Sequence, residues 1–141
     1  EKYEYRANKK NGDLWYGHDK EIEEDSLNYY QNLIERGVFY VRQKENISEL
    51  KVTDEEVNHL ENIKEIFSMH NTKYKIVISP LYDQVPLETT QMELLENIFG
   101  SENIYDFSGE NEFTESIHNY YETSHYRPHV ADEIMELIYK D

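Results

Sequence analysis

A carboxylate and an imidazole lie three positions apart near the end of the sequence, at Glu122 and His125. A carboxylate that accepts a hydrogen bond from one ring nitrogen of histidine fixes the tautomer and stabilises the imidazolium ion. The second ring nitrogen can then act as a general base on a hydroxyl group. The spacing alone is a weak signal, because Glu-x-x-His arises by chance in acidic proteins. The competing interpretation is structural: Glu122 would bind backbone N–H groups at the start of a helix, and His125 would cap that helix.

Other polar residues near this pair are weaker candidates. His118 and His129 flank it, but the sequence has no compact metal-binding motif such as His-Glu-x-x-His, so we expect no metal ion and no cofactor. Ser124 is the immediate neighbour of the candidate base in the sequence, which seldom gives productive geometry for a nucleophile. Ser79 is expected to end a strand. The chain has no cysteine, which excludes disulfides, thiolate metal sites and a cysteine nucleophile.

Aromatic residues are frequent in the N-terminal third, and two interpretations of them are open. Aromatic side chains can form a platform on which a sugar ring stacks, or they can fill a core that is poor in Leu and Val while their hydroxyl groups stay hydrated. We expect a core role for most of the tyrosines, and Trp15 is the residue for which this expectation is weakest. The residues concerned are Trp15, Tyr16, Tyr29, Tyr30 and Tyr40.

The length of 141 residues corresponds to a single domain, residues 1–141. Lys and Arg together number 14 and Asp and Glu 30, which gives a net charge of −16. Such a chain repels phosphate backbones and anionic headgroups, so we expect no binding to nucleic acid, and no apolar run is long enough for membrane insertion. Aromatic residues make up 13% of the chain, which argues against disorder. The sequence starts at Glu1 without an initiator methionine, so we expect a processed protein or a piece of a longer one.

Periodicity, caps and breakers predict the elements that position these residues. Residues 1–25 are expected to be irregular or to form a short hairpin with a turn at Asn11-Gly12-Asp13. Residues 38–41 are compatible with a strand or with a loop. The predicted helices are 25–35, 53–70, 87–99 and 128–139, and the predicted strands are 75–79 and 103–107.

The first two helices carry the clearest signals. Asp25 or Ser26 can cap the first helix and Gly37 can end it, with an apolar stripe of Leu27, Tyr30, Leu33 and Ile34. Thr53 and Glu56 form a capping box for the second helix. We expect that helix to bury Val57, Leu60, Ile63, Ile66 and Phe67.

The order helix, strand, helix, strand, helix predicts an α/β fold with a parallel sheet. Two strands are few for such a sheet, so we expect further strands from the N-terminal segments or from sequence outside this chain. From this order we also expect strands 75–79 and 104–107 to be parallel neighbours. Ligands of α/β folds bind beyond the carboxyl ends of the strands. We therefore expect His125 to lie at the carboxyl-end edge of the sheet, in a loop before the last helix, with Glu122 within hydrogen-bond reach of its Nδ1.

The stretch from Lys73 to Asp141 resembles the C-terminal half of the SGNH (GDSL-like) hydrolase superfamily. More narrowly, it is similar to the bacterial cell-surface branch that includes the teichoic-acid D-alanylation protein and the alginate O-acetylation proteins. The features that carry the resemblance are the strand ending in Ser79-Pro80, the helix ending at Gly100, the strand Asn103–Phe107, and Glu122-Thr123-Ser124-His125-Tyr126-Arg127-Pro128 before a closing helix. The residues before Lys73 fit the family only loosely.

The resemblance implies that His125 is a catalytic base and that Glu122 takes the place of the family's Asp, as its orienting carboxylate. It also implies a three-layer, flavodoxin-like architecture that is incomplete at the N-terminus of this chain. The family's serine nucleophile lies in a Gly-Asp-Ser turn, and a Gly-x-Asn-Asp segment supplies oxyanion donors. Neither is present in the 141 residues, where Gly12-Asp13-Leu14 has the wrong third residue.

The function implied is that of the C-terminal segment of an esterase or acyltransferase acting on ester-linked acyl groups, with an acylated cell-surface glycan as substrate. The serine would then lie outside this chain. The resemblance also implies an extracytoplasmic location, at the cell surface or in the periplasm. The alternative is a non-catalytic α/β module of a bacterial envelope assembly that binds a glycan or a protein, and a third reading is an unrelated small α/β domain with no site. Upstream Gly-Asp-Ser sequence would favour the enzyme, and its absence would favour the binding module.

Overall fold

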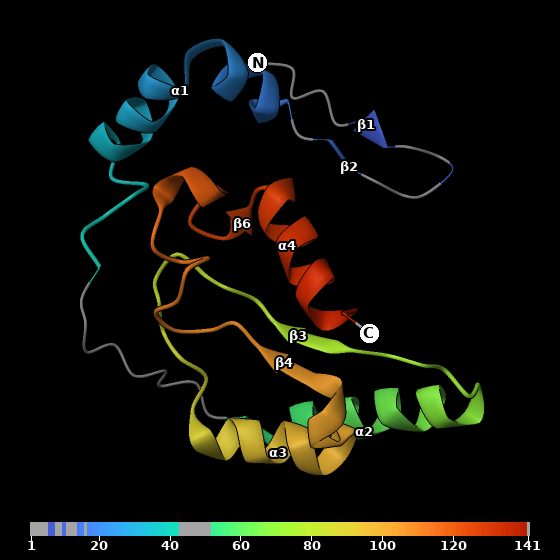
Figure 1. Cartoon of the computed structure of the whole chain (residues 1–141). Coiled ribbons are helices and arrows are strands. Elements are labelled where there is room, and N and C mark those ends of the chain that lie inside the picture. Colours follow the sequence, from blue (N-terminus) through green and yellow to red (C-terminus); the bar gives the residue numbers. More distant parts are fainter. Residues whose placement is uncertain (1–5, 8–9, 11–13, 16, 43–51, 141) are drawn as a thin grey trace.

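The computed structural model describes residues 6–7, 10, 14–15, 17–42 and 52–140. The strands, in chain order, are β1 (Arg6–Ala7), β2 (Leu14–Trp15), β3 (Ile76–Ile78), β4 (Ile104–Asp106), β5 (Tyr120–Glu122) and β6 (His125–Tyr126). The α-helices are α1 (His18–Glu35), α2 (Asp54–Met69), α3 (Thr89–Phe99) and α4 (Pro128–Ile138), and Ser101–Asn103 and Ile117–Asn119 form single 3₁₀ turns (Figure 1). None of the described helices is long and apolar enough to cross a bilayer.

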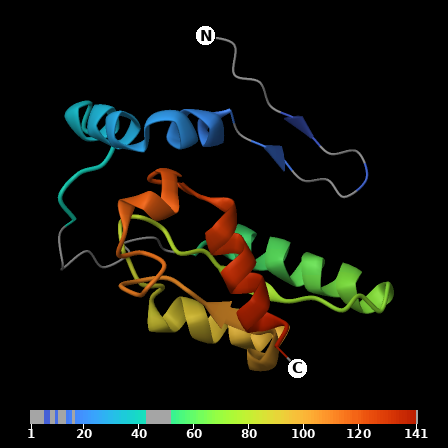
Figure 2. The ribbon, with the colours of Figure 1, turned by 45° about the horizontal axis from the view of Figure 1, so that its top comes forward.

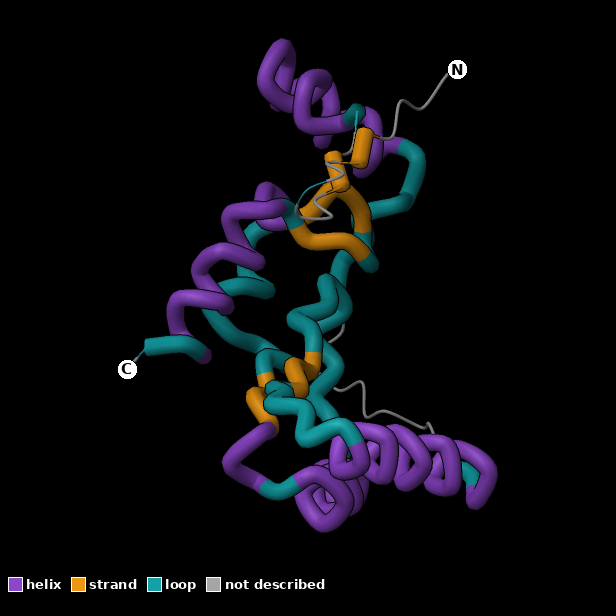
Figure 3. The backbone as a smooth tube through the Cα atoms, turned by 90° about the vertical axis from the view of Figure 1, so that its right-hand side faces the viewer, coloured by secondary structure: helices purple, strands orange, loops and turns teal. Residues whose placement is uncertain are grey.

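The two predicted strands are confirmed as parallel neighbours. In the β3–β4 pair, Ile76 lies opposite Ile104 and Ile78 lies opposite Asp106. Helix α4 covers one side of this pair, and α2 and α3 lie on the other side (Figures 1 and 3). The buried face of α4 packs against side chains of both strands; the residues in this cluster are Phe113, Val130, Ile134, Ile138, Val77, Tyr105, Phe107 and Tyr126. The chain therefore has a mixed α/β fold with a small parallel sheet.

Helix α2 has the predicted ends but not the predicted burial. The Thr53 hydroxyl accepts a hydrogen bond from the Glu56 N–H at 3.3 Å, and the Glu56 carboxylate accepts from the Thr53 N–H at 2.7 Å. This backbone hydrogen bond holds the pKa of Glu56 below its usual value. The five apolar residues expected to be buried are all at least partly exposed: Ile63 and Ile66 are exposed, and Val57, Leu60 and Phe67 are half-buried. The burial prediction was wrong because α3 is the only described helix or strand that packs closely against α2.

Helix α1 begins earlier than predicted and is broken in the middle. It starts at His18, so the expectation of an irregular segment up to residue 25 was wrong for its last eight residues. Asp25 has non-helical dihedral angles (φ −155°, ψ 76°), and its carboxylate accepts a hydrogen bond from the Asn28 N–H at 3.1 Å. The predicted capping residue therefore begins the second half of a longer helix. At the other end, Gly37 adopts a φ of +72° and ends the helix as predicted.

The buried face of α1 also differs from the predicted stripe. Ile22 and Tyr30 are buried, whereas Leu27 is 79% exposed and Ile34 is 50% exposed. The predicted stripe lies wholly after the break at Asp25, where Tyr30 and Leu33 contact the core and no described segment covers Leu27 or Ile34. Residues 38–41 form no strand. Strands β1 and β2 form the expected antiparallel hairpin, and the predicted turn at 11–13 and the side chains of Trp15 and Tyr16 lie outside the described residues.

Buried tyrosines fill the core between α1 and the β5–β6 hairpin, together with Ile22 and Phe39. We expected the tyrosine hydroxyl groups to stay hydrated, but those of Tyr29, Tyr30 and Tyr120 donate to backbone carbonyls instead. The Tyr30 hydroxyl donates to the Tyr120 carbonyl and that of Tyr29 to the Tyr121 carbonyl, both at 2.9 Å. The Tyr120 hydroxyl donates to the carbonyl of Pro80 at 3.0 Å. The core prediction is thus confirmed for Tyr30, Tyr29 is half-buried against that core, and Tyr40 is exposed; the predicted state of the Tyr29 and Tyr30 hydroxyls was wrong.

The Tyr30→Phe substitution tests the contribution of these bonds. It leaves the ring in place but removes the donor to the buried Tyr120 carbonyl, so we expect the free energy of unfolding to fall by about 1–2 kcal/mol. Tyr40→Phe is the matched control because Tyr40 is 48% exposed, and its effect should stay within about 0.5 kcal/mol. Guanidinium denaturation followed by circular dichroism measures both. Equal stability of the two variants would contradict this account of the core.

Candidate functional site

Glu122 and His125 are direct cross-strand partners in the β5–β6 hairpin. Thr123 and Ser124 form the two-residue turn between them, so the candidate pair occupies a hairpin and the predicted loop was wrong. Tyr120 lies opposite Tyr126, which leaves Tyr121 as an extra residue, a β-bulge, on β5. Directly opposed residues in an antiparallel pair project their side chains to the same face. The turn therefore places the carboxylate beside the imidazole.

The side chains make the predicted contact. His125 Nδ1 is hydrogen-bonded to one carboxylate oxygen of Glu122. The other carboxylate oxygen accepts from the Ser124 backbone N–H at 2.9 Å. With both oxygens engaged, the carboxylate has a defined orientation. The competing interpretation is correct in one part: Glu122 does bind a backbone N–H group. However, the N-cap of α4 is Arg127, and within the described residues no side chain caps that helix.

The imidazole is accessible from outside the protein. The His125 side chain is 60% exposed, and that of Glu122 is 37% exposed. Because Nδ1 is bonded to the carboxylate, Nε2 is the ring nitrogen that would exchange a proton with another group. The arrangement suits a general base whose orientation is fixed by the protein. These catalytic roles remain predictions.

The hairpin lies at the carboxyl end of β3, as predicted. The segment after β3 contacts it in two places: the Tyr82 N–H donates to the Thr123 carbonyl at 3.3 Å, and the Tyr120 hydroxyl donates to the Pro80 carbonyl at 3.0 Å. Burial raises the pKa of Tyr120 to about 12, so this hydroxyl keeps its proton and its donor role even in moderately alkaline solution. The parallel sheet thus fixes the position of the turn that carries the pair.

The loop after β4 is held rigidly beside the hairpin. Thr114 is fully buried, and its hydroxyl donates to the Gly109 carbonyl at 3.0 Å. Gly109 has a φ of +76°, and a Cβ there would lie 3.3 Å from Pro86, which explains the glycine. The Arg42 guanidinium donates to the carbonyl groups of Thr114 and Glu115. Asn119 follows this loop, and its amide donates to the Phe113 carbonyl at 2.9 Å.

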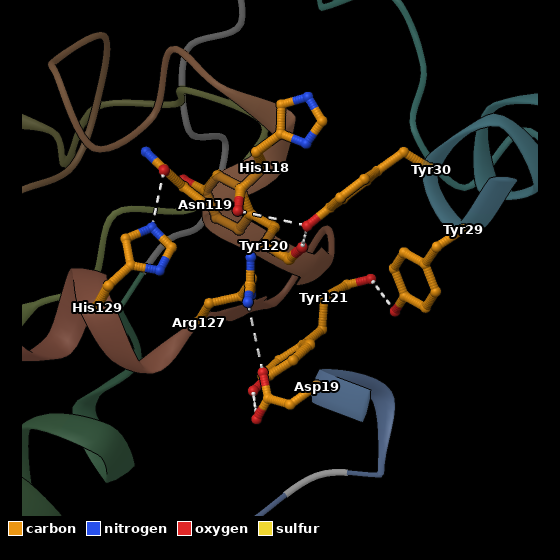
Figure 4. A network of polar contacts seen from close by, with 9 residues as sticks. All are labelled: Asp19, Tyr29, Tyr30, His118, Asn119, Tyr120, Tyr121, Arg127 and His129. Atoms are coloured by element: carbon orange, nitrogen blue, oxygen red, sulfur yellow. Dashed lines mark hydrogen bonds and ion pairs between the residues drawn. The ribbon is translucent and has the colours of Figure 1, made fainter. Parts of the chain in front are cut away.

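Asp19, at the start of α1, joins the two strands of the hairpin (Figure 4). Its carboxylate accepts a hydrogen bond from the Tyr121 hydroxyl at 2.6 Å and lies 3.6 Å from the Arg127 guanidinium. Tyr121 directly precedes Glu122, and Arg127 follows His125 by two positions. Burial, together with the bonded Asp19 carboxylate, raises the pKa of Tyr121. The Asp19 contacts therefore hold the hairpin from both sides of the candidate pair.

The sequence analysis did not identify Asp19 or Arg127. The two residues are more than one hundred positions apart, and no local spacing or cap links them. The only signal was the proximity of Arg127 to the Glu122–His125 segment.

The remaining polar candidates are used elsewhere. His118 lies edge-on to the Tyr30 ring, with ring centroids 4.5 Å apart, and His129 Nε2 lies 3.1 Å from the Asn119 side-chain oxygen. Neither contact brings these rings together with Glu122. Within the described parts of the chain, no three His, Asp or Glu residues converge as metal ligands would. Ser79 follows β3 and is exposed, and Ser124 lies in the hairpin turn.

The Asp19→Asn substitution tests whether these contacts stabilise the hairpin. It keeps the side-chain shape but removes the negative charge that forms the ion pair with Arg127 and that strengthens the hydrogen bond from the Tyr121 hydroxyl. We expect the free energy of unfolding to fall by about 1–2 kcal/mol. We also expect backbone amide NMR signals of Tyr121 and Glu122 to shift.

Glu24→Gln is the matched control on the same helix. Glu24 lies 3.5 Å from Lys20, but both side chains are more than two-thirds exposed, so the loss should stay below about 0.5 kcal/mol. If the Asp19→Asn variant matched this control in stability and left the hairpin signals unmoved, Asp19 would not position the hairpin.

No family model, no curated protein and no solved structure matches this chain.

Proposed function

We propose that this chain is the C-terminal part of an SGNH-like esterase or acyltransferase domain in which His125 is the general base and Glu122 orients it. The single observation that supports this most is the hydrogen bond between His125 Nδ1 and the Glu122 carboxylate, on an exposed hairpin at the carboxyl end of β3. Carboxylate, imidazole and a hydroxyl nucleophile form the usual set for acyl transfer. The resemblance to the SGNH hydrolases, which rests in part on the same Glu122–His125 segment, agrees with these roles.

In the proposed reaction, His125 Nε2 accepts the proton of a serine hydroxyl as the oxygen attacks the acyl carbon of an ester. Glu122 stabilises the imidazolium that forms. The imidazolium then gives the proton to the departing alkoxide, which leaves as an alcohol. In the second step His125 deprotonates water, or an acceptor hydroxyl, for attack on the acyl-enzyme, and the proton returns to the serine. The chain contains no Gly-Asp-Ser, so the serine belongs to sequence outside these 141 residues.

The finer architecture is part of the same proposal. Parallel sheets usually contain more than two strands, whereas β3 and β4 pair only with each other in the described part of the chain. Strands N-terminal to this chain would extend the pair into the sheet of a three-layer, flavodoxin-like domain. The family resemblance further suggests an acylated cell-surface glycan as substrate and an extracytoplasmic location.

The second candidate function is a non-catalytic envelope module that binds a glycan or a protein. Two sequence features favour it: the missing nucleophile turn, and Glu122 in place of the aspartate that the family carries. In this case the hydrogen bond to His125 would only stabilise the hairpin.

We predict that the 141-residue chain alone has no esterase activity. Loss of the nucleophile of a catalytic triad lowers the rate by about 10⁶-fold. An assay with p-nitrophenyl acetate measures this directly. Turnover above the buffer rate that disappears in His125→Gln would show that a nucleophile lies within this chain.

The complete reading frame that carries this chain tests the proposed roles. If it supplies a Gly-Asp-Ser block, the protein should hydrolyse p-nitrophenyl acetate, and His125→Gln should remove about as much activity as loss of the serine. Glu122→Gln should lower the rate by about 10⁴-fold, as for an orienting carboxylate. His59→Gln, on the exposed surface of α2, is the control and should be fully active. Full activity of the His125 variant, with the serine block present, would rule out the proposed base.

A further inference from the structure

A groove of about 620 Å³ runs between α1 and the bulged strand β5. Figure 2 shows α1 extending above the segment that carries β5 and β6. Glu122 lines the groove and His125 is not among its described lining residues, so the groove borders one member of the candidate pair. Its volume lies within the range of ligand sites in proteins. This inference rests on the proposed function: a substrate whose ester reaches His125 would extend along this groove.

We propose that the groove binds a polyhydroxylated chain that is neutral or amine-bearing, and that it rejects polyanionic chains. The groove is lined by four carboxylates, those of Glu21, Glu24, Asp25 and Glu122, and by one guanidinium, that of Arg36. No lysine lines it. With a net charge of −16 for the whole chain, the electrostatic potential repels anionic ligands and attracts ammonium groups.

The uncharged part of the lining is suited to hydroxyl groups. Asn28 and Asn32 lie four positions apart on α1, so they share one face of the helix about 6 Å apart along its axis. This separation is comparable to the length of one sugar ring. Each amide both donates and accepts, as a hydroxyl does. Carboxylates accept further hydrogen bonds from hydroxyl groups.

Aromatic surface completes the groove. The Tyr29 ring lines it and is only partly buried. Its hydroxyl is already bonded to the Tyr121 carbonyl, so the ring is held in place and can offer its remaining apolar surface to a sugar face or to an ammonium group. Aromatic carbon, amide and carboxylate together match a neutral or amino sugar chain. The same charges argue against teichoic-acid and alginate polymers, which are polyanions.

Titration of the 141-residue chain by ¹H–¹⁵N NMR tests this inference with three oligosaccharides. The probes are cellotetraose, which is neutral, the tetramer of glucosamine, which carries amines, and tetragalacturonate, which is anionic. We expect cellotetraose and the glucosamine tetramer to shift amide signals of α1 and Glu122, with tighter binding of the glucosamine tetramer. Tetragalacturonate should shift none of them. Binding of tetragalacturonate as tight as that of the other two, or no shift with any probe, would overturn the inference.

Two pairs of variants assign any binding to the groove. Asn32→Ala should weaken binding of cellotetraose about tenfold, as expected for loss of one amide contact, whereas Asn58→Ala on the exposed face of α2 should have no effect. Glu24→Lys should weaken binding of the glucosamine tetramer more than binding of cellotetraose. Glu61→Lys on α2 should leave the ratio of the two affinities unchanged. Equal effects of groove and control variants would place the binding elsewhere.

The result is separable from the proposed catalysis. Hydrolysis of p-nitrophenyl acetate by the complete reading frame needs His125 but no groove contact. Loss of that activity in His125→Gln without oligosaccharide binding would therefore refute the groove inference alone. Oligosaccharide binding alongside a fully active His125 variant would refute the catalytic proposal alone.

Discussion

The hydrogen bonds from tyrosine hydroxyls to backbone carbonyls are the interaction on which the rest of the structure depends. Two consecutive tyrosines of α1 donate to two consecutive carbonyls of β5, and Tyr120 of β5 donates in turn to the segment after β3. These bonds join three parts of the chain that share no continuous sheet. An aromatic ring supplies buried area, and its hydroxyl satisfies a carbonyl that water cannot reach. A core with few aliphatic residues can therefore still be specific.

The candidate site depends on this core indirectly, through the hairpin that carries it. Neither Glu122 nor His125 is buried, yet the hairpin that carries them is fixed on one side by α1 and on the other by the end of β3. Burial of Tyr29, Tyr30, Tyr120 and Tyr121 raises the pKa of each, which keeps the hydroxyls protonated as donors in alkaline solution in which an exposed tyrosine would ionise. An exposed pair can thus have a defined geometry because its support is buried.

Local signals in the sequence predicted most helices and strands, whereas burial and ion pairing depended on long-range contacts. The parallel pairing of β3 with β4 and the capping box of Thr53 follow from short patterns, and the structure has both. The spacing of Glu122 and His125 predicted their contact, although the segment is a hairpin with a bulge. The exposure of α2 and the Asp19–Arg127 ion pair were not predictable in this way, because they depend on which distant segments meet. Periodicity identifies an apolar face but does not show whether anything covers it.

The two-residue turn between Glu122 and His125 has a consequence for sequence variation. Side-chain direction along a strand alternates with every residue, so the pairing of carboxylate and imidazole depends on how many residues the turn contains and not on their identity. Thr123 and Ser124 can accordingly be exchanged for other turn-forming residues. A single insertion or deletion between the pair would instead rotate one partner to the opposite face of the hairpin. Among natural variants of this segment, substitutions in the turn should accumulate while its length stays constant.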